Sequence, residues 1–239
     1  MALLLKNGAI FLHIPKTGGS WVSSVLEDQG LVDRKICHIH ADLDEVYRFL
    51  NFRRVIGSEI MKQLNPYASV KSKIFVKRGF RTVILSKRKK IPFIFCFVRN
   101  PLGWYESYFT YMQANGWPEL GDIFDVASKH PCSVLNGIDH ETFEDFISAV
   151  VDKFPGFLTN LFSRYTDARI GYIGKQESLV DDLVAVLEYL KLDFNEDSIR
   201  SFQKVNMREK DSLVDIVWTE RIEQDIFACE YPIYKRFEY

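Results

Sequence analysis

Residues 9–21 read Ala-Ile-Phe-Leu-His-Ile-Pro-Lys-Thr-Gly-Gly-Ser-Trp, and this stretch decides the fold. The apolar run Ala9–Ile14 predicts a buried strand, because the run is short and is ended by Pro15 and two glycines. After the glycines, apolar side chains recur at the spacing of a helix that stops near Gly30: Trp21, Val22, Val25 and Leu26. The chain is therefore predicted to open with a strand, a glycine-containing turn and a helix.

The glycine turn, residues 15–19, has the composition of an anion-binding site. Glycines let backbone N–H groups approach a phosphate-like group, and the start of the following helix adds a partial positive charge. Lys16 adds a full charge, and the hydroxyls of Thr17 and Ser20 can donate hydrogen bonds. The turn is not the phosphate loop of nucleoside triphosphatases, whose lysine follows the glycines. An ordinary strand-to-helix turn with a surface lysine is the alternative interpretation.

A second polar signature follows the apolar run Pro92–Val98, which predicts a central buried strand. The run ends at Arg99, and Pro101 is suited to be the first residue of a helix. An arginine at a strand end can bind a phosphate through two parallel hydrogen bonds. Ser107 comes eight residues later, about two helical turns on, and is expected on the same side.

Strand and helix patterns alternate along the rest of the chain. Further short strands are expected at Arg54–Ser58, Thr82–Ser86 and Arg169–Gly174. Helices are expected at 42–50, 142–152, 178–190 and 211–228, the first three opening at the capping residues Asp42, Thr142 and Ser178. This alternation favours a single α/β domain over residues 1–239 with a mostly parallel sheet, whose ligands bind at the carboxyl ends of the strands.

The charge of the chain is unevenly distributed. The formal net charge is -1, yet residues 60–105 contain no Asp or Glu and eleven Lys or Arg. Such a split indicates either an anionic partner or a solvated basic surface. The run Lys87–Lys90 lacks interleaved aromatic residues, so no nucleic-acid partner is expected.

Cysteine spacing and hydropathy exclude several classes of protein. The four cysteines lie far apart, so neither a metal site nor a disulfide scaffold is expected. No stretch approaches the roughly 18 apolar residues of a membrane span, and the apolar start is too short for a signal peptide. These features predict a cytoplasmic protein without an integral membrane segment.

The two polar signatures together resemble a known family. HIPKTGGSW at residues 13–21 and FVRNPLGWYES at 97–107 are similar to the donor-binding motifs of sulfotransferases that use 3′-phosphoadenosine 5′-phosphosulfate (PAPS), most closely the carbohydrate-type branch. Residues 172–179 and 231–239 resemble the family more weakly. The resemblance implies a three-layer α/β sandwich with a central parallel sheet, related to P-loop nucleotide kinases. It also implies PAPS as co-substrate, a carbohydrate or other hydroxyl acceptor, and no metal.

The resemblance also assigns roles to residues by their position in the motifs. Lys16 would stabilise the leaving phosphate, and Arg99 and Ser107 would bind the 3′-phosphate of the donor. The 5′-phosphosulfate would be enclosed by Pro15, Lys16, Thr17, Gly18, Gly19, Ser20 and Trp21. The family commonly has a charged residue about five positions after this arginine. Here Gly103-Trp104 occupies that stretch, which leaves any further contact from it open.

A sulfuryl acceptor needs a general base, and histidine is suited to that role near neutral pH. Some carbohydrate sulfotransferases place this histidine in the region that holds His38 and His40 here. His40 is the favoured base and His38 the alternative, and on an extended segment the two would point the same way. A role in capping the next helix is the competing interpretation. Other family members use a glutamate, so Glu59 stays a candidate, whereas His13 is expected to pack beside the glycine turn.

The expected reaction is in-line transfer of a sulfuryl group from PAPS to a hydroxyl. One alternative is an ATP-dependent P-loop-type kinase, which calls for a lysine after the glycines and an acidic magnesium ligand at a strand end. The sequence shows neither. The other alternative is a binding module that kept the glycine turn and lost the base. His130 and His140 flank a loop expected to shape the acceptor pocket, and neither is assigned a role.

Overall fold

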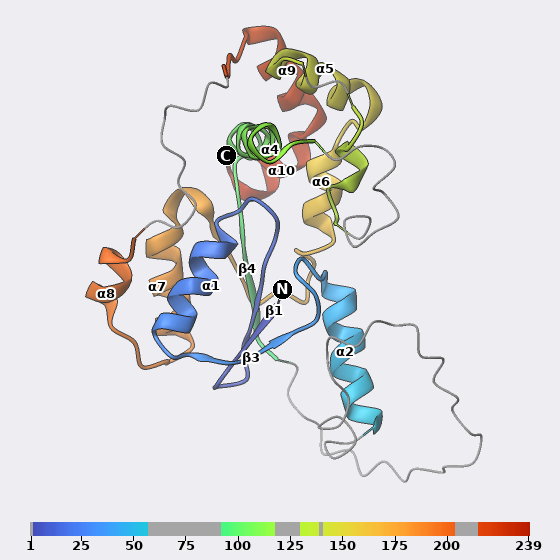
Figure 1. Cartoon of the computed structure of the whole chain (residues 1–239). Helices are drawn as coiled ribbons and strands as arrows, with labels where there is room; N and C mark the ends of the chain where they lie inside the picture. Colours follow the sequence, from blue (N-terminus) through green and yellow to red (C-terminus); the bar gives the residue numbers. More distant parts are fainter. Residues whose placement is uncertain (1, 57–91, 118–129, 139–140, 204–214) are drawn as a thin grey trace, which may run out of the picture.

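The structure is a computed structural model that describes residues 2–56, 92–117, 130–138, 141–203 and 215–239 (Figure 1). The strand predicted at 82–86, Glu59 and His140 lie outside these residues. So do ten of the eleven basic residues between 60 and 105, which leaves Arg99 as the member of that group with a described position.

One sheet of five strands forms the centre of the described chain. The strands are β1 (Ala2–Leu5), β2 (Ile10–Leu12), β3 (Val32–Ile36), β4 (Ile94–Val98) and β5 (Tyr172–Lys175), in the order β3-β1-β2-β4-β5. Strands β2, β4 and β5 are parallel, with Leu12 opposite Cys96 and Val98 opposite Lys175. The glycine turn after β2 and the Arg99 signature after β4 therefore follow neighbouring parallel strands.

The sheet is mixed, which corrects the prediction of a central parallel sheet. Strand β1 runs antiparallel to both β2 and β3. Its connection to β2 is a tight turn in which the Leu5 amide donates to the Ala9 carbonyl at 2.8 Å. A turn this short can only join antiparallel neighbours, because a parallel connection needs a crossover of a dozen or more residues.

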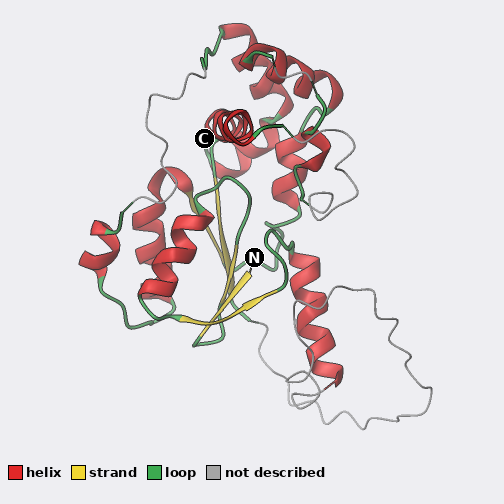
Figure 2. Ribbon diagram, viewed as in Figure 1, coloured by secondary structure: helices red, strands yellow, loops and turns green. Residues whose placement is uncertain are grey.

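Helices cover both faces of this sheet, as Figure 2 shows. One face carries α1 (Gly19–Asp28), α7 (Leu179–Tyr189) and α8 (Glu196–Ser201). The other side carries α2 (Leu43–Ile56) and α6 (Phe157–Ser163). Beyond the end of β4, a group of helices shares the core of this side: α4 (Pro101–Asn115), α5 (Phe143–Lys153), α9 (Glu220–Cys229) and α10 (Tyr231–Phe237). Short 3₁₀ turns occur at Ser133–Leu135 and Gln176–Ser178.

The apolar strands are buried on both sides because successive side chains point to opposite faces. On β4, Phe95 and Phe97 pack toward α1 and α7, whereas Ile94, Cys96 and Val98 pack toward α2 and α4. All five of these side chains are at most 1% exposed. The uninterrupted apolar sequence of this strand thus matches its central place in the sheet.

A buried carboxylate joins four of the helices. Glu230, at the junction of α9 and α10, is fully buried and accepts the Tyr105 hydroxyl of α4 at 2.7 Å. It also accepts the amide hydrogens of Leu158 and Thr159 at 2.9 and 2.8 Å, and the Thr159 hydroxyl at 2.6 Å. These amides lie in the first turn of α6, where a negative charge is stabilising. Glu230 therefore anchors the helix that carries the Arg99 signature.

Several predicted boundaries were wrong. Arg54–Ile56 belongs to the end of α2 and not to a strand, because the helix opened by Asp42 continues past Leu50. Asp42 and Glu45 form the expected capping box, each accepting the other's amide hydrogen, at 3.1 and 3.0 Å. The last predicted helix begins at Glu220, since Thr219 accepts the Ile222 amide and caps it there. Residues 215–219 are not helical, and the predicted start at residues 211–214 lies outside the described residues.

Other helix ends agree with the capping signals in the sequence. Thr142 caps α5 by accepting the Asp145 amide, and Asn100 caps α4 with Pro101 as its first residue. Ser178 precedes α7 as expected but makes no capping bond, because its hydroxyl donates to Asp182. Among the described residues, no helix has the length and apolar character needed to cross a membrane.

Candidate active site

The glycine turn leaves β2 and enters α1 through two residues with left-handed backbone conformations. Lys16 has a φ of 63° and Gly18 a φ of 81°. The Thr17 hydroxyl donates to the Ile14 carbonyl at 3.0 Å, and the side chain is 1% exposed. The hydroxyl proton of Thr17 is therefore used inside the turn, which corrects the expectation that it donates to a ligand.

The two glycines of the turn are required for different reasons, Gly18 by its positive φ of 81° and Gly19 by close packing. A Cβ on Gly18 would lie 2.6 Å from Leu179 Cδ2, and a Cβ on Gly19 would lie 2.5 Å from His13 Nε2 and closer still to His13 Cδ2. Real Cβ atoms essentially never come this close to a neighbour. The His13 imidazole thus occupies the place where a side chain at position 19 would stand, in line with the packing role expected for His13.

The first turn of α1 presents backbone donors that no side chain caps. Gly18 is the N-cap residue, and the first turn contains no acidic residue. Uncapped N–H groups at the start of a helix attract an anion. Ser20 is exposed at this end, whereas Trp21 is 6% exposed and packs against Phe202, so its ring belongs to the core and not to the turn surface.

Arg99 meets the glycine turn across the carboxyl ends of β2 and β4. Its Nη1 donates to the Lys16 carbonyl at 3.4 Å, which brings together two residues that lie 83 positions apart. Burial lowers the pKa of this guanidinium, and the nearby Glu177 carboxylate offsets part of that effect. Within the described ranges Arg99 forms no ion pair. A half-buried guanidinium that has no carboxylate partner favours an anionic ligand.

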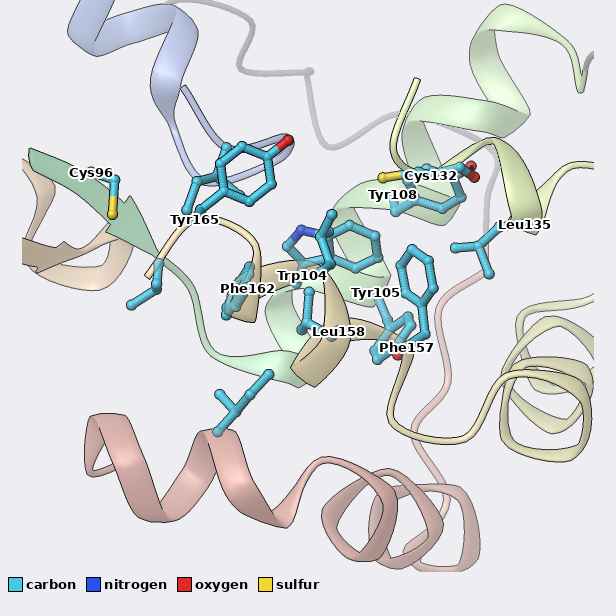
Figure 3. Close-up of a cluster of buried hydrophobic side chains, with 14 of the residues drawn as sticks. Cys96, Trp104, Tyr105, Tyr108, Cys132, Leu135, Phe157, Leu158, Phe162 and Tyr165 are labelled. Atoms are coloured by element: carbon cyan, nitrogen blue, oxygen red, sulfur yellow. Dashed lines mark hydrogen bonds between the residues drawn. The ribbon is translucent and has the colours of Figure 1, made fainter. Parts of the chain in front are cut away.

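The absence of a charged side chain at Gly103-Trp104 has a structural explanation. A Cβ on Gly103 would lie 3.1 Å from Arg99 Nε, so the missing side chain gives the guanidinium room along the helix. The Trp104 indole N–H donates to the Pro15 carbonyl at 2.9 Å, and its ring is fully buried (Figure 3). Trp104 therefore fixes the start of the glycine turn, a role that the sequence did not indicate. Ser107 lies in the second turn of α4 and is half-buried.

His40 lies in the loop between β3 and α2 and faces the end of β2. Its Nδ1 is 3.4 Å from the His13 carbonyl oxygen, which can only accept a hydrogen bond. The ring proton of neutral His40 is thus on Nδ1, and Nε2 keeps the lone pair that a base needs. The Tyr165 hydroxyl donates to the His40 carbonyl at 2.6 Å, and Tyr165 itself is buried in the core drawn in Figure 3.

His38 is turned away from this position. Its Nε2 lies 3.0 Å from both carboxylate oxygens of Glu45, and its Nδ1 lies 2.6 Å from the Ile39 carbonyl. The segment is not extended, because Cys37 and His40 have φ values of 57° and 66°. The two histidines therefore do not point the same way. His38 is exposed and contacts the glutamate of the capping box, whereas Asp42 and Glu45 themselves cap the helix.

Three imidazoles meet at this end of the site. The rings of His13 and His40 have centroids 4.9 Å apart, and those of His40 and His130 are 4.7 Å apart, both pairs edge to face. Burial lowers the pKa of His40 to about 2 and that of His13 to about 3, and it also lowers the pKa of His130. All three are neutral near pH 7. In the part of the chain that is described, no group of His, Cys, Asp or Glu is arranged to hold a metal ion.

Lys16 points from the turn toward α4. Its Nζ lies 4.2 Å from the ring centroid of Tyr111, an exposed residue of that helix. Its charge also helps to lower the pKa of His130. The Lys16 ammonium thus lies beside α4 and acts electrostatically on one of the three imidazoles. Tyr165 and Tyr111 lie in no motif, and Trp104 lies in the second motif without an assigned role, so only contacts across the fold reveal what these three residues do.

The structure therefore gathers Lys16, Arg99 and His40 at the carboxyl ends of two parallel strands and leaves His38 outside. A separate cavity of about 440 Å³, lined by Phe109, Phe143 and Val217 among others, contains none of the predicted site residues. Comparison with protein-family models, with curated proteins and with solved structures found no match to this chain.

Proposed function

We propose that this chain is a PAPS-dependent sulfotransferase that transfers a sulfuryl group to a hydroxyl of a carbohydrate acceptor. The observation that carries the proposal is the contact between Arg99 and the Lys16 carbonyl, which joins the two motifs on neighbouring strands. PAPS carries anionic groups at its 5′ and 3′ positions, and the two motifs offer a cationic position for each. The parallel strands and the helices on both faces support the finer expectation of a three-layer, nucleotide-kinase-like sandwich.

The 5′-phosphosulfate binds at the start of α1 in this proposal. The uncapped amides of the first turn and the Lys16 ammonium supply donors and positive charge there. Arg99 and Ser107 bind the 3′-phosphate. Arg99 forms no ion pair with any residue that the structure describes, and this supports the role, since a phosphate would replace part of the hydration that burial removes from the guanidinium.

The proposed step is an in-line displacement at sulfur. The acceptor hydroxyl gives its proton to His40 Nε2 while its oxygen forms a bond to sulfur, and the bond between sulfur and the bridging oxygen breaks. The electron pair of that bond stays with the departing 5′-phosphate, where Lys16 stabilises the charge. Burial lowers the pKa of His40 and so keeps the ring neutral before the reaction. The same burial opposes protonation of Nε2, and in this proposal the negative charge of the bound donor offsets that effect.

A ligand series tests the donor assignment. The nucleotide product 3′-phosphoadenosine 5′-phosphate (PAP) should raise the melting temperature, and ATP with magnesium should not. Arg99→Ala should weaken PAP binding about 10- to 100-fold, since a hydrogen-bonded charge pair is lost. The same variant should leave 5′-AMP, which has no 3′-phosphate, unaffected.

A matched control is Arg34→Ala, which removes a surface arginine of β3 paired with Asp33. This variant should bind PAP as the wild type does. Stabilisation by ATP with magnesium but not by PAP would contradict the sulfotransferase proposal and favour a kinase. Equal losses of PAP and 5′-AMP in Arg99→Ala would contradict the assignment of Arg99 to the 3′-phosphate.

A further inference from the structure

His130 lies beside the proposed base although no motif marks it. Its ring meets that of His40 edge to face, with centroids 4.7 Å apart and planes at 81°. The two residues lie far apart in the chain, so the contact comes from the fold. Lys16 is close enough to His130 for its charge to lower the histidine's pKa. His130 therefore neighbours both the proposed base and the proposed cation of the leaving group.

The segment that carries His130 is held firmly. The Ser133 amide donates to the His130 carbonyl at 2.9 Å and closes a turn. Cys132 is fully buried, and its carbonyl accepts the Tyr108 hydroxyl of α4 at 3.3 Å. A group on such an anchored turn keeps a fixed position, which an enzyme needs for a hydrogen-bond donor aimed at developing charge.

The hydrogen bonds of His130 decide which ring nitrogen carries its proton. The Cys132 amide donates to His130 Nδ1 at 3.1 Å, which occupies the lone pair of that nitrogen. In the neutral ring the proton is therefore on Nε2. His130 thus has a donor to offer and no vacant lone pair, whereas neighbouring His40 has its proton on Nδ1 and a lone pair on Nε2. His40 is therefore suited to accept a proton, and the adjacent His130 is suited to donate a hydrogen bond.

We propose that His130 donates a hydrogen bond from Nε2 to a non-bridging oxygen of the sulfuryl group. This inference rests on the proposed function. In an in-line transfer the sulfuryl group lies between the base and the leaving oxygen, which is the place that His130 borders. A neutral donor binds the anionic oxygens without adding a positive charge next to His40. Such a charge would hinder the protonation of His40 during the reaction. His130 is not a second base, because its Nδ1 lone pair is already engaged.

Comparing PAPS with PAP isolates this contact, because PAP lacks the sulfuryl group. His130→Phe keeps a ring against His40 and removes the donor. It should weaken PAPS binding about 3- to 10-fold and leave PAP binding unchanged, as expected for one lost hydrogen bond. It should also lower kcat for sulfate transfer about 100-fold, the scale seen when one donor to a developing charge is removed.

His130→Gln is the matched variant. Its amide keeps both an N–H donor and an oxygen that can accept the Cys132 amide, so it should recover PAPS binding and part of kcat. Melting temperatures of both variants show whether the fold is kept, and His130→Gln still decides the question if His130→Phe does not fold. Equal effects on PAPS and PAP, or a His130→Gln no better than His130→Phe, would overturn the inference. A wild type that binds neither nucleotide would overturn the proposed function and this inference with it.

Discussion

Gly19→Ala adds one methyl group where His13 stands, and this makes it a sharp test of the site's packing. The new Cβ would lie 2.5 Å from His13 Nε2, whereas ordinary contacts are 3.4–4 Å. His13 is 6% exposed and has Phe11 and His40 against its ring, at centroid distances of 6.3 and 4.9 Å. The imidazole must therefore retreat by more than about 1 Å into a filled core, because Cδ2 would lie still closer than Nε2.

Overpacking of this kind lowers the free energy of unfolding by about 1–3 kcal/mol. Replacing a helical glycine by alanine raises it by less than about 1 kcal/mol, because the unfolded chain loses conformational freedom. We expect Gly19→Ala to lower the free energy of unfolding by about 1–2 kcal/mol. In a chain of this size that corresponds to a drop in melting temperature of roughly 2–8 °C. His40 should move as well, because its Nδ1 is bonded to the His13 carbonyl.

Urea unfolding of a double-mutant cycle separates this clash from other causes. In a His13→Ala background the ring is absent, so Gly19→Ala should cost at least about 1 kcal/mol less than it does in the wild type. Ser20→Ala, at the exposed next position of α1, serves as control and should change stability by less than about 0.5 kcal/mol. The same cost for Gly19→Ala in both backgrounds would refute the reasoning.

Two further predictions concern buried groups. Glu230→Ala leaves the Tyr105 hydroxyl and the amides of Leu158 and Thr159 without their buried acceptor, so it should cost about 3–5 kcal/mol in urea unfolding. Glu230→Gln keeps one acceptor oxygen and should cost less, while a loss below about 1 kcal/mol for the alanine variant would contradict the anchoring role. Because burial lowers the pKa of His40 from 6.5 to about 2, the unfolded chain binds a proton below pH 6.5 that the folded chain excludes. Stability should thus fall as the pH drops below 6.5, and His40→Gln should reduce this slope by up to about 1.4 kcal/mol per pH unit. An unchanged slope would show that His40 titrates normally.

Local signals predicted the elements that carry the two motifs. Apolar runs ended by Pro15 and by Arg99 gave β2 and β4. Capping residues gave the starts of α2 and α5, and Pro101 gave the start of α4. Strands β1 and β3 were missed. The apolar start of the chain was considered only as a signal peptide, and the charged residues Asp33, Arg34 and Lys35 give β3 no apolar pattern. Helices α6 and α10 have seven residues each, which are too few to show a period, and depend on tertiary contacts such as those of Glu230.

Local signals in the sequence also predicted part of the candidate site. Lys16, Arg99 and His40 lie in recognisable local patterns at strand ends or before a helix. The contacts of His40 with His130, and of Trp104 with Pro15, join residues about 90 positions apart. No local pattern encodes such pairs, so a single sequence leaves them hidden. The choice between His38 and His40 likewise depended on backbone angles that the sequence does not display.

Transfer of labelled sulfate from PAPS to a panel of sugars and oligosaccharides tests the central claim most directly. The wild type should label at least one hydroxyl acceptor. Lys16→Ala and His40→Ala should each lower the rate by about 100-fold or more, while PAP binding in His40→Ala stays unchanged. A wild type that binds PAP but labels no acceptor would contradict the claim and favour a binding module. Transfer that survives His40→Ala undiminished would contradict the assignment of the base.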